Sequence, residues 1–426
     1  MKEIVIQKKR LKCVSCSSKL SEEIVIIGDQ YPSAIFFNEN DPLLRSLSSS
    51  SLNLVRCTNE KCNLVQLSFD YDLQYVFDHY PYESGSTATM KQILQEVVDD
   101  SLDIVDLRKD DVVLDIGGND GTMLSLLNKP LKAKVNIDAA SGVKQIVQDS
   151  NYRHVHARFS ADEYNNLNLP NPKLITCVAM FYHLSNPLEF CRDVKEIMSD
   201  DTVWVIQMTY LGTMLIDNIF DNIVHEHAVY YSLSSLEFLL SKVGLQIAEA
   251  RIVKSYGGSL RVFVVKNPDK FPKKHFRKDY HGILKFEKEN QINSFESLYA
   301  FNSRVQLLKN TIGNIIDHII EKQGPIYGFG ASTKGNMILQ LLNIRNDKMI
   351  GILDNNKKKI GTYTTGSLIP IIEEDLHIEN LPEYLFVLPY YYKEAFKRII
   401  QKKLKKDQKV YLFIPLPYPH FITVKN

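Results

Sequence analysis

The sequence predicts an α/β protein built around nucleotide-type sheets. Residues 112–127 and residues 325–336 both follow the order of strand, glycine-rich turn and helix start. Apolar runs of strand length alternate with helical patterns around them, which is typical of a parallel sheet covered by helices. Because the chain has 426 residues, a usual domain size of ~100–200 residues predicts two or three domains.

Composition excludes several classes of protein. The 51 basic and 50 acidic residues leave a net charge of +1, so no global charge favours nucleic acid. No apolar run reaches membrane-spanning length, and the charged start, residues 1–10, does not have the pattern of a signal peptide. Six cysteines are too few for a disulfide scaffold of this length. A cytoplasmic protein is the simplest expectation.

Four cysteines form two pairs near the N-terminus, Cys13-x2-Cys16 and Cys57-x4-Cys62. Such pairs hold one ion from two turns, and four thiolates close a tetrahedral zinc site with no open position for water. We therefore expect structural Zn²⁺ in a domain of residues 1–75. Reduced buried cysteines without a metal are the alternative.

An aromatic and hydroxyl-rich stretch, residues 75–89, precedes a helical pattern at residues 90–107. It contains Tyr80, Tyr82 and Ser84. Tyrosines here can simply pack between domains, which is the favoured interpretation. The functional alternative is a lid over a cofactor.

The first glycine loop reads D-x-G-G-x-x-G after the apolar strand of residues 112–116. A backbone without Cβ atoms can approach a nucleotide-like ligand closely. The spacing favours S-adenosylmethionine over NAD. The candidate residues are Asp115, Gly117, Gly118, Asn119 and Gly121.

Two acidic residues follow the next expected strands. Asp138 ends the strand of residues 134–138, at the position where an acid accepts hydrogen bonds from both ribose hydroxyls. The alternative is an ordinary aspartate in a turn at the end of a strand. The glycine loop upstream favours the ribose-binding interpretation. Asp162 follows a third strand and is placed to meet an adenine amino group.

The strand of residues 174–180 delivers His183 at its carboxyl end, where active sites of such sheets gather. After a further strand at residues 202–207 comes His225-Glu226-His227. The spacing is wrong for the H-E-x-x-H zinc helix. In extended chain the two histidines share a face and Glu226 points away. A histidine beside a carboxylate is a suitable general base near neutral pH, although a hydrogen-bonded structural turn is the alternative for each residue alone.

The limb Gly257-Gly258-Ser259 is either a tight turn or a phosphate cradle before a strand, and Arg261 is either a sheet-face cation or a phosphate partner. Residues 267–323 predict a helical connector. In the second glycine loop, G-x-G-A-S is a weak NAD pattern, with Asp354 at a ribose-binding position. Lys334, beside a helix start, suits a phosphate instead.

Taken together, these motifs resemble the deoxysugar C-methyltransferases that act on nucleotide-linked 4-ketosugars. The resemblance spans nearly the whole chain in family order: the cysteine pairs, residues 80–87, 115–121, His183, 225–232, 257–261 and 328–336. Two departures stand out. Val224 occupies the position of a tyrosine that often precedes H-E-H, and the second cysteine pair is stretched.

The resemblance implies three domains: a zinc-binding domain (1–75), a Rossmann-like S-adenosylmethionine domain (76–266), and a connector with a C-terminal Rossmann-like domain (267–426). It implies methylation of C3 of a 4-keto-6-deoxyhexose carried on dTDP or GDP, by a monomer or weak dimer. His227 is the implied base. The other implied residues are Glu226, His183, His225 and Tyr82 for catalysis; Tyr80, Ser84, Asp115, Gly117, Gly118, Asn119, Gly121, Asp138 and Asp162 for the cofactor; and Gly257, Gly258, Ser259, Arg261, Ser332, Lys334 and Asn336 for the substrate.

Three other functions remain open at this point. An O- or N-methyltransferase on the same scaffold would need no enolate. An NAD-dependent sugar-nucleotide oxidoreductase would use the loop at Gly328. A zinc-ribbon binding protein with degenerate enzyme domains would not bind S-adenosylmethionine.

Overall fold

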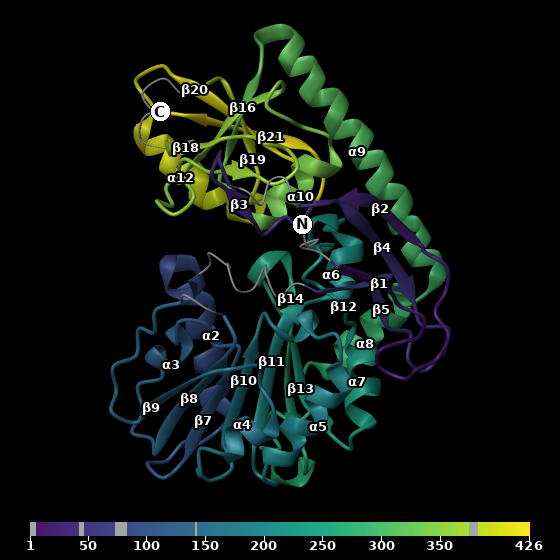
Figure 1. Ribbon diagram of the computed structural model, residues 1–426, viewed down its shortest axis with the longest axis vertical. Coiled ribbons are helices and arrows are strands. Elements are labelled where there is room, and N and C mark those ends of the chain that lie inside the picture. The colour runs from purple at the N-terminus through teal and green to yellow at the C-terminus, as the bar shows by residue number, and fades with distance from the viewer. Residues whose placement is uncertain (1–5, 42–46, 73–82, 141–142, 375–381) are drawn as a thin grey trace.

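A computed structural model describes residues 6–41, 47–72, 83–140, 143–374 and 382–426. Figure 1 shows two α/β lobes, with the central domain below and the C-terminal domain above. The N-terminal strands lie at the side, against the long helix α9 (Phe295–Gln323). Within the described residues, no helix is long and apolar enough to cross a membrane.

The central domain contains a seven-stranded sheet in the order β13-β14-β11-β10-β7-β8-β9. All neighbours from β11 to β9 are parallel, whereas β14 runs antiparallel to both β11 and β13. The strands are β7 (Val112–Ile116), β8 (Ala133–Asp138), β9 (Tyr152–His156), β10 (Leu174–Val178), β11 (Val203–Thr209), β13 (Gln246–Val253) and β14 (Ser259–Val265). The strands expected from the apolar runs are confirmed.

Helices cover both faces of this sheet (Figure 1), because its central strands are apolar on both sides. The helices are α2 (Ala88–Ile104), α3 (Thr122–Leu126), α4 (Ala161–Asn165), α5 (Pro187–Ile197), α6 (Leu211–Ile216), α7 (Leu233–Ser241) and α8 (Tyr280–Glu289). Short 3₁₀ turns add η2 (Ser84–Ser86), η3 (Phe181–His183), η4 (Phe220–Asn222), η5 (Ser255–Gly257) and η6 (Pro268–Lys270).

The C-terminal domain has a second sheet, in the order β18-β16-β15-β19-β20-β21. Its strands are β15 (Ile326–Phe329), β16 (Met349–Asp354), β18 (Ile371–Glu373), β19 (Tyr384–Val387), β20 (Lys409–Ile414) and β21 (His420–Lys425). They are parallel except for β21, and are accompanied by α10 (Thr333–Leu341), η8 (Tyr390–Tyr392) and α12 (Lys393–Lys403). The repeated strand, glycine turn and helix is therefore confirmed.

The N-terminal sheet has the order β12-β5-β4-β2 and borrows a strand from the central chain. Its own strands are β2 (Val25–Gln30), β4 (Ser50–Arg56) and β5 (Val65–Leu67), whereas β12 (Val229–Tyr230) follows the H-E-H motif. A second exchange pairs β3 (Phe36–Phe37) with β17 (Tyr363–Thr364) of the C-terminal domain, and β1 (Ile6–Lys9) pairs with β6 (Phe69–Asp72). The ranges of the three domains stay a prediction. The pairs β12–β5 and β17–β3 each join strands from two of these domains.

Candidate active site

The first glycine loop turns sharply at the carboxyl end of β7. Gly117 has a φ of 72°, and a Cβ at this residue would lie 2.9 Å from Cγ of Met180, which follows β10. Only glycine fits both the left-handed backbone and this close approach. The loop then enters α3 at the point where the carboxyl ends of β7, β8 and β10 meet. This location suits the methionine end of S-adenosylmethionine.

Asp115 lies beneath this loop. Its side chain is buried and accepts a hydrogen bond from Thr176 Oγ1 at 2.7 Å. Its other carboxylate oxygen would be 2.5 Å from a Cβ at Gly118, so the aspartate and glycine are packed against each other. Burial raises the pKa of Asp115 to about 7. The structure thus gives Asp115 a role in supporting the loop, and its contact with a cofactor stays a prediction.

Asp138 ends β8 beside the loop, as expected. Its Oδ2 accepts the Asn119 backbone N–H at 2.7 Å, and its Oδ1 accepts the Ala140 N–H at 2.6 Å. A carboxylate oxygen has two lone pairs, so both oxygens can still accept a ribose hydroxyl. These two acceptor oxygens therefore fit the ribose hydroxyls of S-adenosylmethionine.

The segment before α2 closes over the same loop. The Ser84 N–H donates to Asn119 Oδ1 at 3.0 Å, and the Gly85 N–H donates to Asp120 Oδ2 at 2.8 Å. The lid interpretation of this stretch agrees with these contacts for residues 83–87, while Tyr80 and Tyr82 lie outside the described residues. Asp120 was not among the predicted site residues, although its position directly after Gly-Gly-Asn indicates a place in the loop.

Asp162 is exposed in the first turn of α4, where Ser160 caps the helix by accepting the Glu163 N–H. An acid in this position interacts favourably with the helix dipole without any ligand. Its proposed contact with adenine stays a prediction.

Two histidines from different elements meet beyond the sheet edge. His183 ends η3 after β10, and its ring stacks on that of His227 with centroids 5.4 Å apart and planes inclined by 22°. Tyr182 packs against the same His227 ring at 4.2 Å. His183 and His227 were expected to line one pocket, and the structure brings them together.

The His227 ring is fixed by its neighbour in η4. Its Nδ1 lies 2.7 Å from the backbone oxygen of Asn222, a pure acceptor, so Nδ1 carries the proton and donates it. Nε2 consequently has a free lone pair, as a general base requires. Burial holds the pKa of His227 well below its usual value, and the nearby His183 and Lys334 lower it further. His227 is therefore neutral at neutral pH.

The side chains of His225 and His227 point in different directions. This corrects the expectation that the two histidines share one face of an extended chain. Residues 224–228 form a turn, in which the His227 N–H donates to the Val224 oxygen at 3.0 Å. His225 therefore turns into the N-terminal domain, where its Nε2 lies 3.0 Å from Ser50 Oγ and its ring packs edge-on against Tyr71. It holds the turn in place and belongs outside the catalytic set.

Glu226 is buried, and one of its oxygens, Oε2, has no hydrogen-bond partner within the described residues. Burial raises the pKa of Glu226 to about 7. An unpaired buried carboxyl oxygen is costly unless a ligand pairs with it. This observation fits the expected role of Glu226 in lining a pocket.

The buried His225 predicts a pH dependence of stability. Burial lowers its pKa from 6.5 to about 4, so the unfolded chain binds a proton more readily. Its contribution is therefore fully present above pH 6.5 and is lost as the pH falls towards 4, by about 2 kcal/mol at pH 5. Urea denaturation at pH 7 and pH 5 should show a smaller loss for His225→Gln than for the wild type. An equal loss in both proteins would contradict the assignment.

The Gly257-Gly258-Ser259 limb is a tight turn and not a phosphate cradle. Gly258 has a φ of 124°, and a Cβ there would lie 2.6 Å from Thr213 of α6. Its carbonyl accepts from Thr213 Oγ1 at 3.1 Å, and the Ser259 hydroxyl donates to the Ser255 oxygen at 3.0 Å. Gly258 thus packs the turn against α6 and the Ser259 hydroxyl bonds within the turn, which corrects the assignment of these two residues to phosphate. The assignment of Gly257 stays a prediction.

Arg261 is the sheet-face cation of the two alternatives. Its buried guanidinium donates to Gln207 Oε1 at 2.7 Å and forms an ion pair with Asp100 of α2. Arg251 pairs with the same carboxylate at 2.9 Å. The arginine therefore anchors α2 to the sheet, and we remove it from the substrate-binding residues.

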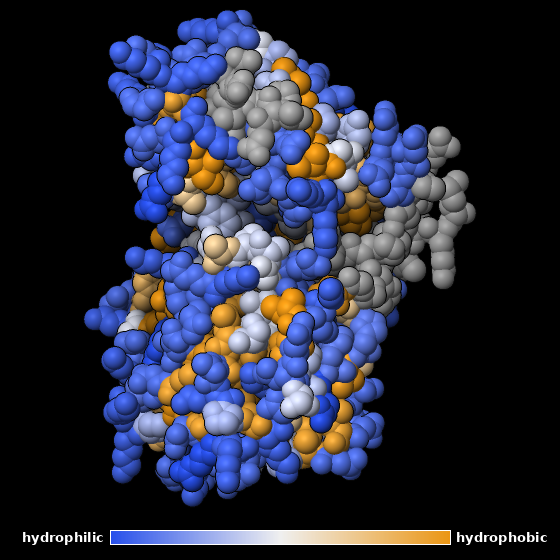
Figure 2. Space-filling model, turned by 90° about the vertical axis from the view of Figure 1, so that its left-hand side faces the viewer, coloured by the Kyte–Doolittle hydropathy of each residue, from blue (hydrophilic) through white to orange (hydrophobic). Residues whose placement is uncertain are grey.

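The C-terminal domain contributes three residues at the start of α10. Ser332 caps the helix by accepting the Gly335 N–H at 2.9 Å. The Asn336 amide nitrogen donates to the Ser33 oxygen at 3.0 Å, whereas its Oδ1 is buried without a partner in the described part of the chain. Lys334 extends to the junction with the central domain, between the rings of Tyr256 and Tyr391. Figure 2 shows the surface indented where the two lobes meet.

The four cysteines of the N-terminal domain lie together. Their sulfur atoms are all within 4.8 Å of one another, with 3.7 Å between Cys13 and Cys62 and 3.5 Å between Cys16 and Cys57. Tetrahedral zinc with Zn–S bonds of 2.3 Å requires about 3.8 Å between sulfurs. The cluster therefore fits one structural metal ion, and Zn²⁺ as that ion stays a prediction.

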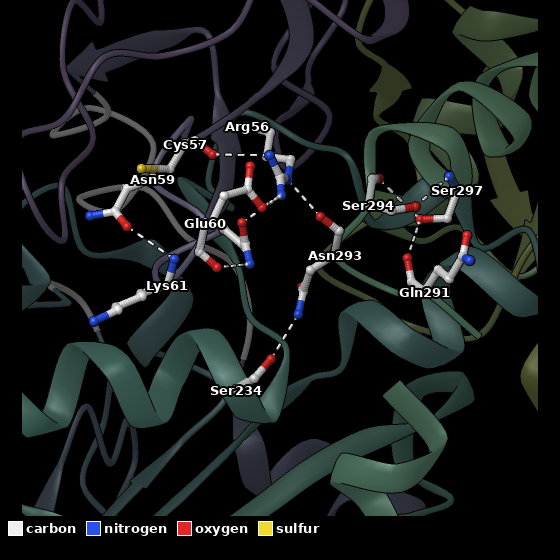
Figure 3. A network of polar contacts seen from close by, with 11 residues as sticks. Arg56, Cys57, Asn59, Glu60, Lys61, Ser234, Gln291, Asn293, Ser294 and Ser297 are labelled. Atoms are coloured by element: carbon white, nitrogen blue, oxygen red, sulfur yellow. Dashed lines mark hydrogen bonds and ion pairs between the residues drawn. The ribbon is translucent and has the colours of Figure 1, made fainter. Parts of the chain in front are cut away.

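Polar contacts connect this cluster to the rest of the protein (Figure 3). Arg56, next to Cys57, donates to the Asn293 oxygen at 2.5 Å, and the Asn293 amide donates to Ser234 Oγ of α7 at 2.7 Å. The ring of Tyr231 is fully buried in the same apolar core as three of the cysteines. The four-cysteine cluster thus packs against the segment that follows the H-E-H motif.

Comparison with known proteins agrees with this geometry. The family described as a methyltransferase domain matches residues 88–250. The family described as a C-methyltransferase C-terminal domain matches residues 254–417. The C-methyltransferase NovU of Streptomyces niveus is 24% identical over 377 residues, which covers 88% of both chains.

Solved structures show weaker similarity. CalO1, a methyltransferase in calicheamicin biosynthesis solved with SAH bound, has 13% identity and a TM-score of 0.32 over 42% of this chain and 54% of its own. The mitomycin 7-O-methyltransferase MmcR has 13% identity and a TM-score of 0.30 over the same shares. The two family matches, the sheet order and the glycine loop together support an S-adenosylmethionine-dependent methyltransferase that is similar to C-methyltransferases.

Proposed function

We propose that this enzyme adds a methyl group to C3 of a nucleotide-linked 4-keto-6-deoxyhexose, carried on dTDP or GDP, through an enolate. The observation that supports this most is His227, a buried neutral imidazole with Nδ1 bound to the Asn222 oxygen and Nε2 left as a base. Methylation of a carbon needs a carbanion, whereas methylation of a hydroxyl or amine needs no enolate. Such a base supplies the step that carbon methylation needs, and the similarity of residues 254–417 to a C-methyltransferase C-terminal domain supports carbon as the acceptor.

The chain's own residues would perform the proton transfer. His227 Nε2 removes the C3 proton, which is acidic because C4 is a carbonyl, and the electron pair of the C–H bond forms the enolate. The Asn222 carbonyl holds the resulting imidazolium in place through Nδ1–H. His183, stacked on that ring, and Tyr182 exclude water from it. S-adenosylmethionine supplies the methyl group, held by the loop of residues 117–121 and by Asp138.

The proposal is tested by mass spectrometry of products formed from S-adenosylmethionine and a panel of 4-ketosugar nucleotides. We expect a product that carries one additional methyl group. In deuterated solvent, the unreacted substrate should carry deuterium at C3. Matched sugar nucleotides with a hydroxyl at C4 serve as controls and should remain unmethylated. Methylation of these controls would instead indicate an O- or N-methyltransferase, and oxidation of a sugar with NAD would indicate the oxidoreductase alternative.

A further inference from the structure

A buried cation of the C-terminal domain, Lys334, lies at the junction with the central domain. Lys334 Nζ is buried without a partner within the described residues, 5.4 Å from the ring centre of Tyr391 and 5.8 Å from that of Tyr256. An ammonium has three hydrogens to donate, and burying it unpaired is costly. A ligand oxygen bound there would remove this cost.

The hydrogen-bond acceptors near Lys334 belong to η4, the element whose Asn222 oxygen orients the base His227. Burial lowers the pKa of Lys334, and the charge of Asp221, which precedes Asn222 in η4, opposes this shift. Asp221 Oδ1 accepts the Tyr390 hydroxyl at 3.1 Å, whereas Asp221 Oδ2 and Asn222 Oδ1 are buried without partners within the described residues. The charge of Lys334 also acts on His227. The cation, its carboxylate and the base therefore lie near one another where the two domains meet.

From this arrangement, and resting on the proposed function, we infer that the Lys334 ammonium binds the C4 ketone oxygen and stabilises the enolate. Loss of the C3 proton to His227 Nε2 moves the C–H electron pair into a C3–C4 double bond. The carbonyl π pair then moves onto the ketone oxygen, where Lys334 meets the new charge. This ketone oxygen lies about 2.4 Å from C3. A cation near the base that removes the C3 proton is therefore also near the ketone oxygen.

The charge balance favours a ketone over a diphosphate as the partner of Lys334. Burial lowers the pKa of Lys334 and raises the pKa of Asp221, and the charge of each group opposes the shift of the other. An ionised Asp221 would repel a diphosphate brought to the same place. A ketone is neutral when it binds and gains charge only as the proton leaves. An interaction that strengthens only in the transition state raises the rate rather than the affinity.

The test measures exchange of the C3 proton with deuterated solvent, using full-length protein, S-adenosylhomocysteine in place of the methyl donor, and a 4-ketosugar nucleotide. Lys334→Met should lower the maximal exchange rate by about 10²–10³-fold, the usual effect of losing one oxyanion donor. Its affinity for the free nucleoside diphosphate should not change. Lys348→Met is the matched control, because Lys348 is a cation of the same domain that pairs with Asp317 at 2.6 Å. It should exchange at the wild-type rate.

Each outcome decides between assignments. Wild-type exchange by Lys334→Met would overturn the inference, and weaker diphosphate binding with an unchanged maximal rate would make Lys334 a phosphate ligand. If Lys334→Met does not fold, as judged by thermal unfolding and S-adenosylhomocysteine binding, Lys334→Arg provides the same comparison, with slower exchange and unchanged diphosphate affinity expected. Wild-type protein that exchanges no 4-ketosugar would overturn the proposed function and this inference with it.

Discussion

His227→Ala should lower C3 proton exchange and methyl transfer by about 10²–10⁴-fold, the range that a positioned general base contributes. The imidazole keeps Nε2 as a base because its Nδ1 donates to the Asn222 oxygen, and alanine offers no replacement. Exchange is followed by mass spectrometry in deuterated solvent, and methyl transfer by product mass. Binding of S-adenosylhomocysteine should be unchanged, because the glycine loop lies on a different element.

His225→Gln is the matched control, two residues away in the same turn. Its ring contacts Ser50 and Tyr71 of the N-terminal domain and not His183. The amide of glutamine can still reach the Ser50 hydroxyl, so the variant should keep most of its turnover at neutral pH. Full activity in His227→Ala, or equal losses in both variants, would show that the base lies elsewhere.

Removal of the metal from the cysteine cluster should abolish folding of the N-terminal domain and activity together. Structural zinc contributes apparent free energies of about 10–16 kcal/mol in small domains. Here β5, three residues beyond Cys62, pairs with β12, and Leu67 N–H donates to the Ala228 oxygen at 3.1 Å. Losing the metal therefore releases the strand that directly follows His227.

A chelator titration monitored by circular dichroism and by turnover measures this coupling. The two curves should coincide, and added Zn²⁺ should restore both signals. Cys57→Ser should behave like the chelated protein, whereas Cys191→Ser, a buried cysteine of α5 outside the cluster, should keep its metal. Metal loss that abolishes turnover while the fold is unchanged would instead give the ion a direct role in the chemistry.

Much of the fold followed from local patterns. The run Val112–Ile116 is buried throughout, as an apolar strand between two helix layers must be, and the glycine turn after it has the expected positive φ at Gly117. The acid at Asp138 also lies where the strand order places it, beside the loop. These features depend on residues within one strand and the turn after it.

The errors came from contacts between distant segments. The turn at Val224 and the pairing of β12 with β5 send His225 and His227 in different directions, which no spacing rule could show. Arg261 looked free for a phosphate because Asp100, its partner, lies far away in the sequence. Lys334 was expected to bind a phosphate, and that expectation could not take into account Asp221 and His227, which come from another domain.

The two strand exchanges set an order for folding during synthesis. The N-terminal sheet lacks its edge strand until residues 229–230 have been made, and β3 lacks its partner until residues 363–364 have been made. Contacts between such distant segments form late and slowly. A fragment that ends at residue 75 would leave both strand edges unpaired. Variants that exchange whole domains between relatives must therefore carry β12 and β17 along with the N-terminal domain.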